Sequence, residues 1–200
     1  GRLGAPQLET LKNLVDEEGL TASTQKRLLL DYSTFVEGVG QRTLDVRLRI
    51  TNGRLELIAK RGEFGGTNRE EASLFIDESD LDSALGFYSL LGYSKAVVCV
   101  RHITRFSFEN VEFAIQKVIN VKTKEVDECF FEAEVLCDDE DGVPGAVANV
   151  RGLLARLRLD EFTTSEWNTY VENLNDTANG VFDFETDPAS QLYELVSSME

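Results

Sequence analysis

The chain has 200 residues, 42% of them hydrophobic, and this length can bury the core of one substantial domain with at most a short tail. The formal net charge of −16 argues against broad electrostatic binding to nucleic acid or to an anionic membrane surface. No apolar run reaches the roughly 18 residues of a membrane span and no secretory signal is visible, so we expect a cytoplasmic protein with reduced cysteines. Because His102 is the one histidine, a His-rich metal centre is excluded.

The first part of the chain predicts a helix followed by a strand. The helix is expected within residues 1–19, because Pro6 suits a first helical turn and Gly19 suits a helix end. The strand is expected over residues 25–36, which have an apolar centre. Glycines then lead into the most informative stretch of the sequence.

Residues 45–60 are expected to form a β-hairpin. Apolar and polar residues alternate strictly along its first arm, so Arg47 and Arg49 share the face opposite the apolar side chains. Asn52-Gly53 is a strong hairpin signal, because both central residues of a type I′ turn need positive φ. The return arm ends at Lys60, so one short hairpin presents several cations.

The rest of the chain alternates between strand and helix patterns, with a glycine-rich loop at 62–66, an acidic loop at 138–145 and a polar, acidic segment at 175–186. In chain order the expected elements are a strand at 69–76, a helix from Ser79 or Asp80 to about 91, a strand at 95–103, a hairpin of 105–108 and 111–118 turning at 109–110, a strand at 127–136, a helix at 147–158, a helix at 166–174 capped by Ser165, and a last helix from 187 to about 198.

These elements predict an α+β fold with about seven or eight antiparallel strands and helices between them. Such a sheet must close on itself or be covered in order to bury its apolar faces, and we expect a closed eight-stranded antiparallel barrel with flanking helices.

Four of the expected strands carry charged residues opposite an apolar face. A simple explanation is that these faces are solvated, as one face of an antiparallel sheet often is. Two features favour a functional explanation. Arginine and lysine are concentrated in the early strands of an acidic chain, and the spacing of Glu132 and Glu134 puts two carboxylates on one strand face, where they can share a hard cation. Cations beside a carboxylate pair suit a phosphate chain with Mg²⁺ or Mn²⁺.

The order of these motifs resembles the CYTH superfamily, also called the triphosphate tunnel metalloenzymes. The resemblance covers roughly residues 8–175 and rests on "VRLRI", "LELIAK", the glycine loop, "REEAS", "LGY", "VCVR", "FEAEV" and "WNTYVENL" in that order. It implies an antiparallel eight-stranded barrel with a charged tunnel. Members include inorganic tripolyphosphatases, thiamine triphosphatases, class IV adenylyl cyclases and the fungal and protozoan type of RNA 5′-triphosphatase.

The resemblance also implies roles for individual residues. Cations on four strands would bind the triphosphate, and three carboxylates would hold Mg²⁺ or Mn²⁺ and act in catalysis. The expected substrate-binding residues are Arg47, Arg49, Lys60, Arg69 and Arg101, and the expected metal-binding and catalytic residues are Glu132, Glu134 and Glu71. Residues 1–175 would form the triphosphate tunnel domain, and residues 176–200 an acidic linker with a C-terminal helix.

Three positions depart from the family pattern. The family begins with an "ExExK" strand that has no counterpart before the first helix, so this strand is expected upstream of Gly1. Cys99 stands where the family has a lysine, and Gln116 stands where an aspartate is expected. Both replacements would weaken phosphate or metal binding.

The sequence therefore leaves four functions open. The first is metal-dependent hydrolysis of a small-molecule triphosphate or of an RNA 5′ end, and the second is binding of a phosphorylated ligand or polyphosphate without turnover. The third is class IV-type cyclisation of ATP. The fourth is a structural role in which the acidic exterior and residues 187–200 assemble with a partner. A homodimer is compatible with each, whereas membrane attachment and broad nucleic-acid binding are not expected.

Overall fold

The computed structural model describes residues 1–31, 43–64, 69–137 and 141–197. Within these residues eight strands form one antiparallel sheet, and the order along it is β4-β3-β2-β1-β5-β6-β7, with β8 pairing a second part of β5. The strands are β1 Ser23–Asp31, β2 Leu44–Thr51, β3 Arg54–Arg61, β4 Glu70–Ile76, β5 Lys95–Phe108, β6 Val111–Ile119, β7 Val126–Glu134 and β8 Gly180–Asp183.

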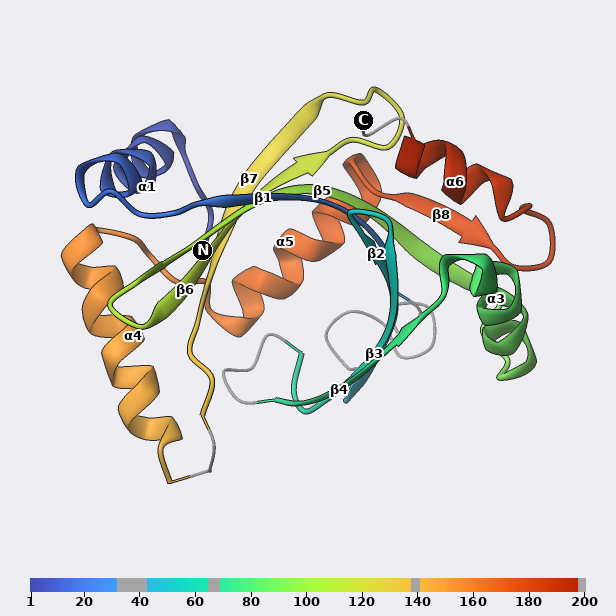
Figure 1. Ribbon diagram of the computed structural model, residues 1–200, viewed down its shortest axis with the longest axis horizontal. Coiled ribbons are helices and arrows are strands. Elements are labelled where there is room, and N and C mark those ends of the chain that lie inside the picture. Colours follow the sequence, from blue (N-terminus) through green and yellow to red (C-terminus); the bar gives the residue numbers. More distant parts are fainter. Residues whose placement is uncertain (32–42, 65–68, 138–140, 198–200) are drawn as a thin grey trace.

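The sheet is strongly curved but, over the described residues, it is not closed (Figure 1). The strand path ends at β4 on one side, where Leu74 is 60% exposed and Phe75 54% exposed. At the other end, Arg2 bridges to Phe130 of β7. The predicted α+β class and the antiparallel eight-stranded sheet are confirmed, whereas closure into a barrel is not, because no pairing joins β4 to β7 among the described residues.

Both predicted hairpin turns are present. Asn52 and Gly53 have φ values of 47° and 82°, and Glu109 and Asn110 have φ values of 49° and 61°. Positive φ at both central residues is the requirement of a type I′ turn, whose twist matches that of the paired strands. The strand expected at 95–103 and the first arm of the next hairpin prove to be one continuous strand, β5.

The helices follow the predicted pattern with shifted boundaries. The helix expected at 166–174 begins earlier, because Thr163 and Glu166 form a reciprocal capping box; Ser165 is therefore not its cap. The helical elements are α1 Ala5–Glu17, the short 3-10 helix η1 Glu78–Asp80, α3 Leu81–Leu90, α4 Val143–Leu157, α5 Thr164–Thr177 and α6 Ser190–Ser197. No helix among the described residues is long and apolar enough to cross a membrane.

The polar segment 175–186, predicted without regular structure, contains β8. Its strand forms because Gly180 pairs with Val98 and Asp183 with Lys95, partners that are distant in sequence. Three other predictions lie partly outside the described residues. They are the end of the strand expected at 25–36, the middle of the glycine-rich loop and the start of the acidic loop at 138–145.

Helices cover the convex face of the sheet at its two ends. At one end α3 and α6 pack on a cluster that includes Leu28, Leu48 and Val100, and at the other end α1 and α4 pack on a cluster that includes Phe106 and Phe113 (Figure 1). These two apolar clusters account for most of the core.

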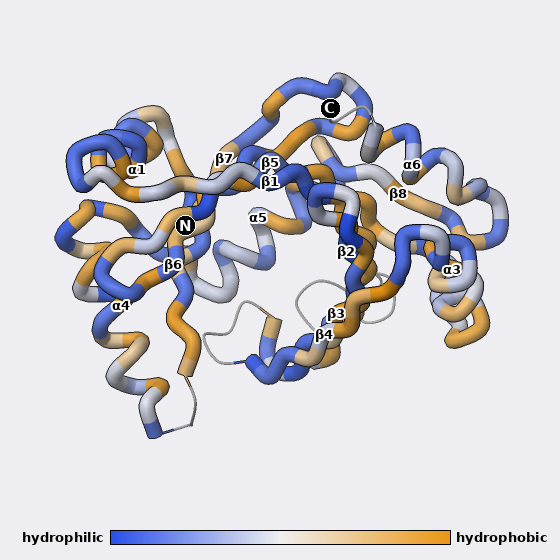
Figure 2. The backbone as a smooth tube through the Cα atoms, viewed as in Figure 1, coloured by the Kyte–Doolittle hydropathy of each residue, from blue (hydrophilic) through white to orange (hydrophobic). Residues whose placement is uncertain are grey.

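The concave face is different, because only α5 lies on it (Figure 1). Tyr170 and Leu174 of α5 pack on Val118 and Phe130, and the Trp167 ring lies 6.1 Å from the Phe64 ring. Hydrophobic and hydrophilic residues alternate along the strands (Figure 2). Many of the apolar side chains pack under the helices of the convex face, so the polar side chains that alternate with them point to the concave face, on which α5 lies.

Candidate functional site on the concave face

The strand register places seven of the eight predicted site residues on the concave face, and a hydrogen bond to Asp45 brings Arg69, which precedes β4, to the same face. Directly paired residues on antiparallel strands point to the same face, and every second residue along a strand returns to it. Asp45 of β2 pairs with Lys60 of β3, and Lys60 pairs with Glu71 of β4, so these three side chains share one face. Arg47 follows Asp45 by two residues on β2 and therefore points to the same face. On β7, Glu132 and Glu134 are two and four residues from Phe130, which packs on α5. The predicted residues that share this face are Arg47, Arg49, Lys60, Arg69, Glu71, Arg101, Glu132 and Glu134.

A buried carboxylate, Asp45, organises the cations on β2 and the start of β4. Asp45 is 0% exposed, and it accepts hydrogen bonds from Arg47 and, at 3.1 Å, from the Arg69 guanidinium. Burial lowers the pKa of Arg47, but the carboxylates of Asp45, Asp31 and Glu132 outweigh this effect and raise it above its usual value. The Nε of Arg47 is buried without a hydrogen-bond partner among the described residues. The sequence placed Asp45 beside these arginines but gave no signal that it is fully buried.

The other two predicted cations of the hairpin are also paired with carboxylates. Arg49 donates from Nε to Glu56 at 2.7 Å, and Glu56 is only 5% exposed. Lys60 Nζ lies 2.6 Å from a carboxylate oxygen of Glu71. Glu71, expected to be a metal ligand, is therefore the ion-pair partner of Lys60.

Arg101 lies on the expected face but not in its open part. It is 7% exposed and donates to the carbonyl of Val100 at 2.8 Å and to the side chain of Asn179 at 3.1 Å. Asn179 in turn donates to Asn175 on α5, so Arg101 ties the sheet to the end of this helix. The structure gives Arg101 a structural contact, and phosphate binding by it stays a prediction.

Arg27 of β1 is the functional candidate that sequence analysis missed. It donates to Thr51 at 3.1 Å and to Gln25 at 3.5 Å, and within the described ranges it makes no ion pair. Burial, followed by the positive charges of Arg49 and Arg105, lowers its pKa to about 10. Arg49 of β2 and Arg105 of β5 are therefore near enough to affect the pKa of Arg27, as are Glu132 and Glu56, which raise it. The alternation of residues along β1 could have assigned Arg27 to this face. The residues that lie beside Arg27 could not be predicted in the same way, because they depend on how β1 pairs with β2 and β5.

The two carboxylates of β7 lie opposite these cations. Glu132 accepts a 2.5 Å hydrogen bond from Gln116, the residue at the expected aspartate position. Partial desolvation and then repulsion from Glu132 raise the pKa of Glu134, while Lys60 and Arg105 oppose the shift. Lys60 belongs to β3 and Glu134 to β7, so charged groups from distant strands approach one another across the curved sheet.

The metal prediction has a mixed outcome. Among residues 1–31, 43–64, 69–137 and 141–197, no group of three or more His, Cys, Asp or Glu side chains could hold a metal ion. The proposed triad of Glu71, Glu132 and Glu134 is thus not assembled, but the two β7 carboxylates are adjacent. Their mutual repulsion is an excess of negative charge that a divalent cation would neutralise, and oxygen ligands of this kind suit Mg²⁺.

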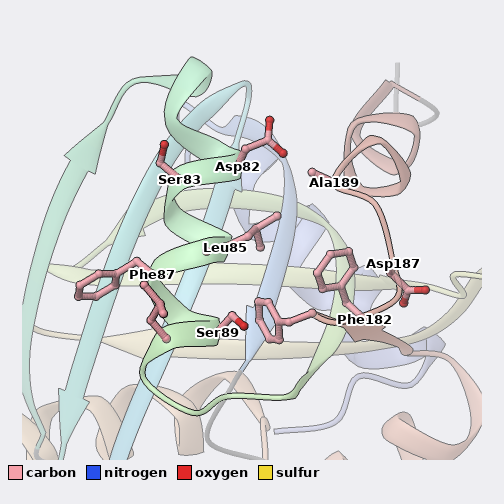
Figure 3. A pocket seen from close by; sticks show the side chains of 11 residues that line it. Asp82, Ser83, Leu85, Phe87, Ser89, Phe182, Asp187 and Ala189 are labelled. Carbon is pink, nitrogen blue, oxygen red and sulfur yellow. The ribbon is translucent and has the colours of Figure 1, made fainter.

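A cavity of about 710 Å³ lies elsewhere, between α3 and the segment from β8 to α6 (Figure 3). Leu85, Phe87 and Phe182 line it together with two aspartates, and no basic residue does so. This cavity is on the convex side, and its lining does not suit a phosphate ligand. The charged concave face therefore remains the candidate site.

No protein-family model matches the sequence, and no curated protein sequence matches it. Solved structures do match. The PH1819 protein of Pyrococcus horikoshii has a TM-score of 0.61 at 20% identity, over 86% of this chain and 96% of that one. A "putative adenylate cyclase" of Vibrio parahaemolyticus has a TM-score of 0.56 at 16% identity, over 81% and 91%. A chain of the Schizosaccharomyces pombe Mediator head module has a TM-score of 0.58 at 11% identity, over 78% and 92%.

At these identities the likeness concerns the fold. A second "putative adenylate cyclase", from Bacillus halodurans, also matches, with a TM-score of 0.50. The CYTH-type fold expected from the sequence is confirmed in this sense. Since a chain of a Mediator assembly matches as well, the fold alone does not separate an enzyme from an assembly subunit.

Proposed function

We propose that the concave face binds the phosphate chain of a triphosphate and, with a divalent cation, hydrolyses it. The observation that carries the proposal is the half-buried Arg27, which makes no ion pair among the described residues and whose pKa is lowered to about 10 by burial and then by the positive charges of Arg49 and Arg105. A partly desolvated guanidinium near like charges is a costly arrangement unless an anion shares it. Such perturbed groups gather at functional sites.

Binding is proposed to begin at Arg27 rather than at the cations that are paired with carboxylates, which include Arg49 and Arg105. Arg27 has no carboxylate partner among the described residues, so its guanidinium is available to phosphate oxygens, which arginine binds bidentately. Arg49 and Arg105 lie close enough to affect its pKa and would contact neighbouring phosphates. Arg47, coupled to Glu132, would extend the cationic surface toward the carboxylates.

Glu132 and Glu134 would hold Mg²⁺ or Mn²⁺, with substrate phosphates completing the coordination, since Mg²⁺ is commonly held by one or two carboxylates plus phosphate oxygens. When bound, the cation supplies charge neutralisation at the phosphoryl oxygens. Glu134, whose pKa is raised, is suited to orient a water molecule and accept its proton. Lys60 and Arg105 would limit that shift.

Binding without turnover is the second candidate. It is favoured by Cys99 and Gln116 at the positions where the family has lysine and aspartate, and by the absence of a three-carboxylate group among the described residues. The names of two structural neighbours raise cyclisation of ATP as a variant of the same site, because ATP carries the same triphosphate. Cyclic AMP formation would distinguish this variant from hydrolysis.

The test combines binding and turnover. We expect tripolyphosphate to raise the Tm of the protein, more so with MgCl2, and inorganic phosphate to be released. Arg27→Gln should weaken binding by about tenfold to a hundredfold, the value of a charge-assisted hydrogen bond of about 1.5–3 kcal/mol. Arg151→Gln is the matched control, because Arg151 is exposed on α4 and pairs with Glu161.

Glu132→Gln combined with Glu134→Gln should abolish the effect of MgCl2 and any phosphate release, while tripolyphosphate binding through Arg27 remains. Binding without release by the unchanged protein would select the second candidate. A Tm that is the same with tripolyphosphate, thiamine triphosphate, ATP or none would overturn the proposal.

A further inference from the structure

A row of basic side chains crosses the opposite, convex face of the sheet. Lys26 of β1 pairs directly with His102 of β5, and His102 pairs directly with Lys117 of β6. Paired residues point to the same face, and Lys26 and His102 adjoin Arg27 and Arg101, which point to the other one. The three residues, called here the convex row, therefore present their side chains together on three adjacent strands.

The convex row lies in a gap between the two apolar clusters. Two residues away on the same strands, Leu28, Val100 and Ile119 belong to the cluster under α3 and α6. In the other direction Ile115 belongs to the cluster under α1 and α4, and these two helix pairs lie at opposite ends of the sheet (Figure 1). Lys26, His102 and Lys117 are partly exposed between them. Their partial exposure leaves these side chains in contact with solvent.

The basic side chains of the convex row are paired directly and repel one another when charged. Like charges directly opposite on neighbouring strands destabilise a sheet. Burial, followed by the positive charges of Lys26 and Lys117, lowers the pKa of His102. No ion pair or side-chain hydrogen bond of Lys117 occurs among the described residues.

The groups around the row are also largely basic or neutral. Cys129 of β7 pairs with Lys117, and Lys12 of α1 is near enough to affect the pKa of this thiol. The nearby carboxylate that affects Cys129 is Glu128, which forms an ion pair with Arg2. In a chain with a net charge of −16, three lysines and the one histidine therefore lie in this neighbourhood.

We propose that the convex row is a second anion site, separate from the concave face, which binds a small multivalent phosphate anion of the pyrophosphate class. Adjacent strands are about 4.8 Å apart, so the row presents two lysines about 10 Å apart with a histidine between them, a span that a single phosphate group does not fill. Lysine binds phosphate as a point charge, and protonated His102 adds a donor to the centre of the row. Bound anion favours the charged imidazole, so binding strengthens as the pH falls through the pKa of His102.

His102 provides a specific probe because it is the one histidine of the chain. The imidazole Hε1 resonance, followed by NMR against pH, reports the pKa of this residue alone. We expect the pKa to be higher in sodium pyrophosphate than in sodium chloride of equal ionic strength, which separates binding from screening of the lysines. Lys117→Ala should weaken pyrophosphate binding by about tenfold or more. The matched control, Lys122→Ala, changes an exposed lysine of the loop between β6 and β7 and should have no effect.

The two anion sites can be tested separately. In Arg27→Gln the response of His102 to pyrophosphate should persist, even if no ligand binds the concave face. Sulfate at equal ionic strength tests whether phosphate is preferred over other oxyanions, and an equal response would widen the ligand class to oxyanions in general. An equal His102 pKa in pyrophosphate and chloride, or an undiminished response in Lys117→Ala, would overturn the proposal.

Discussion

Two arginine clusters on the concave face solve the same electrostatic problem in opposite ways. Around Asp45, two guanidinium groups share one fully buried carboxylate. Around Arg27, a guanidinium without an ion pair in the described part of the chain has two other guanidinium groups as neighbours. In the first cluster one buried carboxylate compensates part of the positive charge and links β2 to the start of β4. In the second, Arg49 pairs with Glu56 and Arg105 with Glu112, so the charge without an ion-pair partner is that of Arg27, and this charge favours an anionic ligand. Basic residues on one face therefore need not share one function.

The largest expected effect comes from breaking the Asp45 cluster. Asp45→Asn keeps the size of the side chain but removes the charge that compensates Arg47 and Arg69, and removing one partner of a buried ion pair costs about 3–5 kcal/mol. Urea unfolding should show this loss. Glu70→Gln, which affects an exposed pair with Arg61 at 3.7 Å, should be close to neutral. A loss below about 1 kcal/mol for Asp45→Asn would mean that water or relaxation compensates the two arginines.

The carboxylate end of the face gives a smaller effect with a defined pH dependence. Because the pKa of Glu134 is raised on folding, the folded state binds more protons than the unfolded state between the ordinary and the raised pKa. Stability from this group is therefore lost as the pH rises through that window. Glu134→Gln should be more stable than the unchanged protein at pH 7, by a few tenths of a kcal/mol, because solvent screens this exposed residue.

The comparison is made by urea unfolding at pH 4 and at pH 7, with Glu112→Gln as a control for loss of charge at the neighbouring pair with Arg105. The stabilisation by Glu134→Gln should vanish at pH 4. Equal stabilisation at both values would show that the ionisation of Glu134, disfavoured by desolvation and by Glu132, is not its cause. A stable variant without phosphate release would separate the catalytic role of Glu134 from any structural role.

Sequence periodicity was sufficient for the parts of the fold that depend on local patterns. The alternation of residues 45–60 and the Asn52-Gly53 turn predicted a hairpin and the face to which Arg47 points. The same alternation predicted that Glu132 and Glu134 share one face of their strand. The face shared by the eight predicted site residues follows from such local parity combined with antiparallel pairing. The family resemblance implied eight antiparallel strands, whereas the order of the strands along the sheet was not predicted.

The features that the sequence did not predict depend on contacts distant along the chain. β8 exists because a polar segment pairs with β5, and Arg101 leaves the open face because Asn179, 78 residues later, accepts its hydrogen bond. The burial of Asp45 and the crowding of Arg27 likewise follow from how far the sheet curves. Periodicity assigns a side chain to a face, but curvature decides which residues of that face meet.

The smallest expected effect concerns Lys60 and Glu71, which pair at 2.6 Å near the edge strand β4 with side chains 23% and 41% exposed. Ion pairs of this exposure contribute about 0–1 kcal/mol, so Glu71→Gln should change stability by no more than about 0.5 kcal/mol. The variant releases Lys60, which should then bind tripolyphosphate as well as or better than before, as measured by titration calorimetry at low salt. Lys60→Met is the matched variant, since it removes the cation and should weaken binding. If Glu71→Gln instead abolishes the effect of MgCl2 on binding, Glu71 holds the metal as the family resemblance implies, and the Lys60 pair opens when the cation binds.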